Sequence, residues 1–270
     1  MRAHNQRIAI ILSSIIVILS FMASIGGLIL PGLYRDNEFV KTTWLGNDAI
    51  TLFIAIPILI ASMYFTQKGS LRAHLIWFGV LDYMLYNYAF YLFAARFNWF
   101  FLIYAALFAL AMLTLIFGLA NLDSNKILCS MKSSMPVDWI AGYFLFIAFG
   151  ISTAYIAQSI GFIITGSLPS IIDVTGHPTN VIFALDLTLL VPWLILGAVW
   201  IRKRYVWGYV IAGIINIKGP IYTLVLAVNS ILVVNAGLTM SNEFPFWGLL
   251  TFLGVLAGIL FYKHIKYVGA

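Results

Sequence analysis

The chain has 270 residues, of which 63% are hydrophobic and 9% are charged, and its formal net charge is +6. Because an ordinary soluble domain has roughly 25% charged residues, this composition excludes a water-soluble globular protein. The positive charge does not indicate nucleic-acid binding, since the densest basic cluster is only Arg202–Arg204. Basic residues that flank membrane helices explain it better.

The first apolar stretch covers residues 8–30. It is too long for the apolar region of a signal peptide, so we expect an uncleaved membrane helix. Similar runs, each long enough to cross about 30 Å of hydrocarbon, recur along the whole chain. The sequence therefore predicts an all-α integral membrane protein. We expect a single polytopic domain over residues 1–270, a bundle of eight transmembrane helices near 8–30, 48–66, 74–95, 99–120, 139–164, 180–201, 206–235 and 245–263.

The positions of the basic residues predict the orientation of these helices. Only Arg35, Lys41 and Arg96 fall on the side opposite the N-terminus. The N-terminal side carries Arg2, Arg7, Lys68, Arg72, Lys126, Lys132, Arg202, Lys203, Arg204, Lys263 and Lys266. Since loops rich in lysine and arginine stay cytoplasmic, we expect an N-in, C-in topology with both termini in the cytoplasm. The outward loops, 31–48 and 165–180, are expected to be connectors or lids over an outward-facing cavity.

The two halves of the sequence, 1–135 and 136–270, are faintly parallel. Each half has four predicted helices, and Pro57 and Pro192 occupy matching helices, the second and the sixth. A deep charge follows in the next helix of each half, Asp82 in the first and Lys218 in the second. The sequence thus allows a 4+4 parallel pseudo-repeat, although prolines are common in membrane helices and coincidence gives the same pattern.

Three charged residues lie within the predicted helices. Lys218 lies about 18 Å along the seventh helix, near the membrane midplane. Asp82 and Asp186 lie at depths from which either can reach it. Because charges inside a bilayer cost several kcal/mol unless they are paired or hydrated, they face the bundle interior. We expect a polar intramembrane site or, equally, a structural ion pair.

The neighbours of these charges are polar as well. On the third helix Tyr86 follows Asp82 at i+4 and Asn87 lies beside it, so this helix should be central. On the seventh helix Tyr222 and Asn229 share a face with Lys218. Pro220 should bend or break that helix and free the carbonyl of Asn216. The residues expected at the outer mouth of the site are Asp48, Arg96 and His177.

No motif for metal or cofactor chemistry occurs in the sequence. The four histidines are scattered, so we predict no metal site, and no nucleotide-binding or hydrolase motif points to a cofactor. These absences favour a protein without enzymatic activity but leave an enzyme open, and the sequence does not identify its catalytic residues. The expected partners are the lipid bilayer and a small solute.

Three functions fit these features. The first is a transporter or permease-like protein for a small solute, an anion being the type that Lys218 would favour. The second is an intramembrane enzyme that acts on a lipid or lipid-linked substrate, with Asp82 or Asp186 as general base. The third is a non-catalytic membrane sensor or assembly partner. The expected location is a cytoplasmic (cell) membrane, and the absence of any N-x-S/T sequon fits a prokaryotic protein. The oligomeric state is not predicted.

Overall fold

A computed structural model describes residues 2–266 of the chain, with side chains from residue 6 onward. The described residues are almost entirely helical and contain no strand, apart from an isolated bridge between Met131 and Ile265. They form two compact units, residues 2–135 with 213–266, and residues 136–212. The boundary between the units falls within one long helix.

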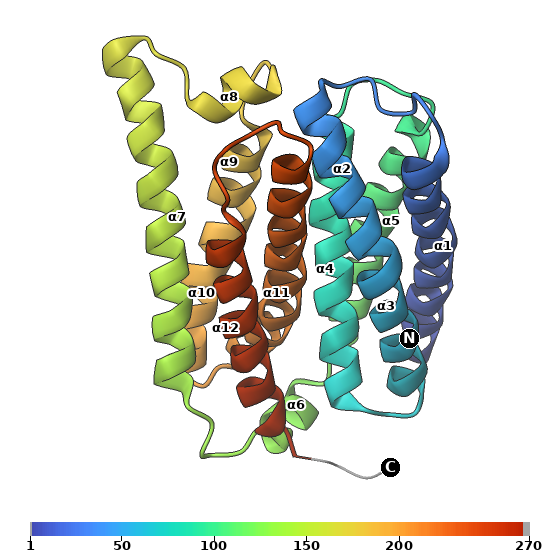
Figure 1. Ribbon diagram of the computed structural model, residues 1–270. Coiled ribbons are helices and arrows are strands. Elements are labelled where there is room, and N and C mark those ends of the chain that lie inside the picture. The colour runs from blue at the N-terminus through green and yellow to red at the C-terminus, as the bar shows by residue number, and fades with distance from the viewer. Residues whose placement is uncertain (1, 267–270) are drawn as a thin grey trace. The chain divides into compact units, whose positions relative to one another are not determined.

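The first unit contains most of the helices (Figure 1). They are α1 (Arg2–Ile29), α2 (Glu38–Ile50), the π-helical turn η1 (Thr51–Ala55), α3 (Ile56–Gln67), α4 (Leu71–Ala94), α5 (Phe101–Leu119), α6 (Ser124–Ser130), α12 (Phe244–Lys263) and, from residue 213, α11 (Val206–Asn235). Helix α5 packs against α1 and α4, and α3 also packs against α4. Helix α4 therefore lies inside the unit, as its many polar residues predict.

The second unit is smaller. It contains α7 (Val137–Thr165), α8 (Ser170–Thr175), α9 (Val181–Leu185), the π-helical turn η2 (Asp186–Leu190), α10 (Val191–Arg202) and the start of α11. Helices α7 and α10 pack against each other, and an ion pair joins Asp138 to Arg202 at 2.9 Å.

Seven helical segments of the described chain are long and apolar enough to cross a membrane. They are Gln6–Ile29, Glu38–Gln67, Phe101–Leu119, Val137–Thr165, Val181–Arg202, Val206–Asn235 and Phe244–Lys263. Large apolar side chains remain exposed on them, for example Phe146 and Phe149, which are 73% and 74% exposed. Such surfaces suit lipid tails, so the chain has the character of a multi-pass membrane protein. The remaining predicted crossing, the third at 74–95, corresponds to α4, which is not among the seven.

The second predicted helix was expected to begin near residue 48, but α2 begins well before it, at Glu38. The Asn37 side chain accepts a hydrogen bond from the amide of Val40, and Glu38 lies in the first turn, where a negative charge is favourable. The charges of this segment therefore mark a helix N-terminus. The predicted outward loop 31–48 shortens to the segment between α1 and α2.

The two π-helical turns precede proline at the same place in each half. Pro57 and Pro192 lie in the first turn of α3 and α10, respectively. A proline cannot donate to the carbonyl four residues back and clashes with it. The wider turn lets the preceding residue bond five residues back instead, Ile56 to Thr51 and Val191 to Asp186.

The agreement between the halves extends beyond the prolines. The π-helical turns start at positions 51 and 186, α3 and α10 at 56 and 191, and α4 and α11 at 71 and 206, so that one constant offset relates all three pairs. The residues with positive φ after α3 and α10, Gly69 (84°) and Arg204 (55°), are related by the same offset. The agreement ends beyond α11, because α5 starts at position 101 and α12 at position 244, which is further along than this offset predicts.

Candidate functional site

The polar residues inside the first unit lie where α2, η1, α4 and α11 meet. Two clusters are present. One surrounds the ion pair of Lys218 and Asp82, and the other surrounds Asp48. We call them the lysine cluster and the Asp48 cluster.

In the lysine cluster the ammonium of Lys218 lies 3.3 Å from a carboxylate oxygen of Asp82. The same ammonium lies over the ring of Tyr86, 4.4 Å from its centroid, a favourable cation–π geometry. The ring of Tyr222 meets that of Tyr86 edge-on at 4.9 Å. The side chain of Lys218 is 8% exposed and that of Asp82 is 26% exposed. The pair is therefore buried at its lysine end and accessible at its aspartate end.

Two glycines shape the surroundings of Lys218. A Cβ at Gly79 of α4 would lie 2.5 Å from Cβ of Ile217, so this glycine lets α11 approach α4.

Pro220 does not break α11, which continues through this proline as one helix. The carbonyl of Asn216, which cannot bond to Pro220, faces Gly258 of α12, where a Cβ would lie 3.0 Å from it. Protein thus covers the carbonyl, as membrane depth requires.

In the Asp48 cluster a carboxyl group is held by two phenols. The hydroxyl of Tyr34 donates to one oxygen of Asp48 at 2.5 Å, and that of Tyr91 donates to the other at 2.9 Å. Asp48 is only 3% exposed. A Cβ at Gly27 of α1 would overlap both Asp48 and Tyr34, so this glycine leaves the space that the pair occupies. Asp48 therefore lies inside the unit, and not at an exposed mouth.

Tyr34 belongs to the segment between α1 and α2, which covers the Asp48 cluster. Leu33 and Tyr34 are buried, although the segment has no regular structure. Burial, and secondarily the neighbouring Asp48, raises the pKa of Tyr34 well above its ordinary value, so the phenol stays a hydrogen-bond donor. The carboxylate of Asp36 accepts from the indole of Trp44 at 3.2 Å and from the amide of Arg96 at 3.0 Å. These bonds hold the segment in place.

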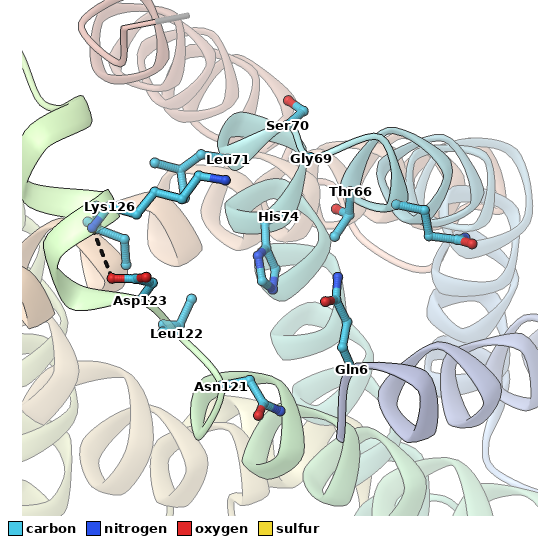
Figure 2. A pocket seen from close by; sticks show the side chains of 12 residues that line it. Gln6, Thr66, Gly69, Ser70, Leu71, His74, Asn121, Leu122, Asp123 and Lys126 are labelled. Atoms are coloured by element: carbon cyan, nitrogen blue, oxygen red, sulfur yellow. Dashed lines mark hydrogen bonds between the residues drawn. The ribbon is translucent and has the colours of Figure 1, made fainter. Parts of the chain in front are cut away.

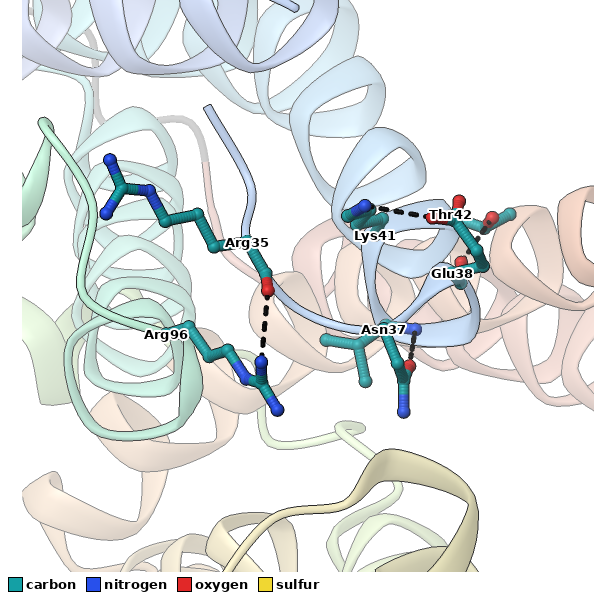
Figure 3. A network of polar contacts seen from close by, with 7 residues as sticks. Arg35, Asn37, Glu38, Lys41, Thr42 and Arg96 are labelled. Carbon is teal, nitrogen blue, oxygen red and sulfur yellow. Dashed lines mark hydrogen bonds and ion pairs between the residues drawn. The ribbon is translucent and has the colours of Figure 1, made fainter. Parts of the chain in front are cut away.

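Further polar contacts line the same segment (Figure 3). A guanidinium nitrogen of Arg96 donates to the carbonyl of Arg35 at 3.5 Å, and the side chain of Arg96 is otherwise exposed. Lys41 pairs with Glu38 at 2.9 Å on the first turns of α2. These exposed contacts lie outside the buried clusters.

A chain of amides and hydroxyls begins at Asn47, next to Asp48. Asn47 donates to Asn87 at 3.1 Å and accepts from Asn229 at 3.0 Å. Asn87 donates to Thr51 at 3.4 Å, and Thr51 shares a hydrogen bond with Tyr83 at 2.9 Å. The carbonyl oxygen of the Asn229 side chain has no hydrogen-bond partner within residues 2–266. Neutral polar groups thus tie α2, η1, α4 and α11 together.

The remaining predicted residues lie in the second unit. The hydroxyl of Tyr155 donates to Asp186 at 3.0 Å, and the ring of Phe183 stacks on that of Tyr155 at 4.0 Å. Asp186 is buried at the start of η2. His177 is half-buried between α8 and α9.

Asp48 itself was predicted as a site residue, but its neighbours Trp44, Asn47, Thr51 and Tyr34 were not. Trp44, Asn47, Asp48 and Thr51 recur at i, i+3, i+4 and i+7, the pattern of one helix face. That pattern was hidden because the helix was expected to begin at residue 48. No local signal points to Tyr34, which reaches the site from an irregular segment.

A pocket of about 380 Å³ lies at the helix ends of the first unit, next to the α3–α4 turn and the α5–α6 connection (Figure 2). It is lined mainly by neutral polar side chains such as those of Gln6, Thr66 and Asn121, with His74 facing it. Asp123 caps α6 by accepting from the amide of Lys126. The pocket contains none of the predicted site residues.

Compared with models of known protein families, with curated proteins and with solved structures, the chain has no match. Among the described residues, no group of three or more histidine, cysteine, aspartate or glutamate side chains is arranged to hold a metal ion. The chemistry of the site must therefore be inferred from its own side chains.

Proposed function

We propose that the protein is a transporter or permease-like protein of the cytoplasmic membrane for a small solute. One observation carries the proposal: Lys218 is buried, while its partner Asp82 is about a quarter exposed. A purely structural pair gains most when both charges are enclosed and fully paired. An ammonium whose carboxylate partner is accessible can instead exchange that partner for an anionic solute. Lys218 is then the solute contact or coupling charge, and Asp82 its counter-ion.

The surroundings of the pair support this role. Tyr86 and Tyr222 provide hydroxyls and aromatic faces beside Lys218, and Asn229 has a free buried acceptor further along the same face of α11. A few convergent polar groups among aromatic side chains are typical of small-molecule sites. Intramembrane charges of this kind mark solute or ion pathways in membrane proteins.

The proposal includes eight crossings in one polytopic domain, with α4 as the third and both termini in the cytoplasm. Helix α4 has 24 residues, which is long enough to span, and its polar residues are directed into the first unit. It also includes an internal duplication of four plus four helices. The constant offset that relates the π-helical turns, the following helices and the positive-φ residues of the two halves supports the duplication.

A ligand screen tests the role of Lys218. We expect one class among acetate, lactate, succinate, glutamate and phosphate to raise the Tm of the detergent-purified protein. The Lys218→Met variant should lose the shift because the solute loses its cationic contact. The control is Lys41→Met, which removes a lysine from an exposed ion pair and should keep the shift. Proteoliposome uptake of the stabilising solute should disappear in Lys218→Met alone.

A structural role predicts a different outcome. Removing only Lys218 leaves Asp82 unpaired, which for a fully buried pair costs about 3–5 kcal/mol and here less, since Asp82 is partly exposed. Replacing both residues, as in Lys218→Met with Asp82→Asn, then restores stability. If no ligand shifts the wild-type Tm and the double variant is as stable as the wild type, the pair is structural. A tightly bound lipid, or a stoichiometric membrane partner, in the purified protein would favour the enzyme or the assembly role.

A further inference from the structure

Asp48 differs from Asp82 in how its charge is compensated. Asp82 has an ammonium at 3.3 Å. Asp48 has two phenol hydroxyls, and its hydrogen bonds and electrostatic neighbours within residues 2–266 include no lysine, arginine or histidine. The two carboxyls belong to the same unit, yet only one has a counter-charge.

Every element packed around Asp48 presents neutral groups to it. The segment between α1 and α2 contributes Tyr34, α1 contributes Gly27, and α11 reaches only the neighbouring Asn47 through Asn229. Within residues 2–266, the titratable side chains that interact with Asp48 are phenols, those of Tyr34, Tyr83, Tyr88, Tyr91 and Tyr104. The nearest acid on the covering segment, Asp36, is bonded to Trp44 and to the Arg96 amide.

The energetic balance favours a neutral carboxyl at this position. Enclosing an uncompensated carboxylate is costly even after relaxation of the surroundings. Two hydrogen bonds to the charged group offset only part of this cost, and part of their gain is retained when the group is neutral. Binding a proton removes the charge altogether. A neutral carboxyl group can keep its hydrogen bonds to Tyr34 and Tyr91.

We propose that Asp48 is a proton-binding site, whose carboxyl group holds one proton at pH 7 while it is enclosed by Tyr34 and Tyr91. The step is the reversible addition of one proton to one carboxylate oxygen, with no other bond made or broken. A role of Asp48 in coupling proton binding to solute movement rests on the proposed transport function. The binding of a proton to Asp48 does not depend on that function.

Infrared difference spectroscopy of the reconstituted protein at pH 7 tests the occupancy directly. The spectrum of wild type minus Asp48→Asn should contain the carbonyl stretch of a protonated carboxyl group, shifted in D₂O. The control is Asp82→Asn, whose difference spectrum should contain carboxylate bands only, because Asp82 pairs with Lys218. Carboxylate bands in the Asp48→Asn difference would overturn the proposal.

A second pair of variants keeps the test decisive if Asp48→Asn does not fold. Tyr91→Phe removes one hydrogen bond to the carboxyl and should move the protonated carbonyl band of the otherwise intact site. Tyr222→Phe is the control, because Tyr222 contacts Tyr86 in the lysine cluster and not Asp48. In this variant the carbonyl band of Asp48 should not move. If the spectra of both variants lack a protonated carboxyl band, Asp48 does not bind a proton. The proposed role of Lys218 in solute transport would then be unaffected.

Discussion

At the residue scale, close packing of small residues decides where the polar side chains can lie. Gly27 leaves the space for the Asp48–Tyr34 pair, and a Cβ at Gly46 would overlap the side-chain oxygen of Asn229. Gly79 lets α11 approach α4 next to the Lys218–Asp82 pair. In a bilayer, where lipid tails are as apolar as the helix surfaces, such approaches allow buried polar groups to find partners.

The variant Gly79→Ala tests this close approach. Its new Cβ would lie 2.5 Å from Cβ of Ile217, so α11 must shift, at a cost of about 1–3 kcal/mol. The matched control is Gly248→Ala on α12, where the nearest atoms are 3.9 Å away and the change should be neutral or stabilising by up to about 1 kcal/mol. Thermal unfolding in one detergent measures both variants. Equal Tm values would show that the helices are not packed as closely as described.

At the element scale, the two π-helical turns are the irregular feature of the spans. Each precedes a proline and replaces the usual four-residue bond by a five-residue bond. The first lies within the polar core, since Thr51 bonds to Tyr83 and Asn87. The second starts at Asp186. Wide turns of this kind occur often at functional sites, because they leave backbone groups less tightly bonded.

Hydrogen exchange should reveal these turns. We expect the amides of Thr51–Ala55 and Asp186–Leu190 to exchange faster than those of the flanking helices. Pro57→Ala restores the missing donor and should slow exchange in the first turn only, so that the second serves as an internal control. Unchanged exchange in Thr51–Ala55 would mean that the proline does not cause the π-helical turn.

The elements could largely be predicted from the sequence, because apolar runs of membrane length leave few alternatives. The predicted helix 206–235 has the same bounds as α11, and the predicted helix 245–263 differs from α12 only at its first residue. The start of α2 was missed because polar cap residues resemble a loop. Residues of the site could be predicted from the sequence only where they share a helix face, as Lys218, Tyr222 and Asn229 do. Partners from irregular segments, such as Tyr34, depend on tertiary packing that local patterns do not contain.

At the scale of the whole molecule, the proposed topology places Cys129 in a cytoplasmic loop. It is an exposed cysteine, and the sequence has no other. A membrane-impermeant maleimide should therefore label it in inverted membrane vesicles and not in intact spheroplasts. The matched variant combines Cys129→Ser with Ser167→Cys, which moves the thiol to the exposed turn after α7 and should reverse the pattern. The same labelling pattern for both proteins would contradict the eight-crossing topology.

The constant offset between the two halves also has an evolutionary consequence. On the proposed eight-crossing topology each half has four crossings. Because four is an even number, a tandem gene duplication would leave both copies in the same orientation. On that offset Tyr83 corresponds to Lys218, and Thr51 corresponds to Asp186. On the proposed duplication, one copy carries neutral hydroxyls where the other carries opposite charges, so the two repeats would have specialised within a single polypeptide.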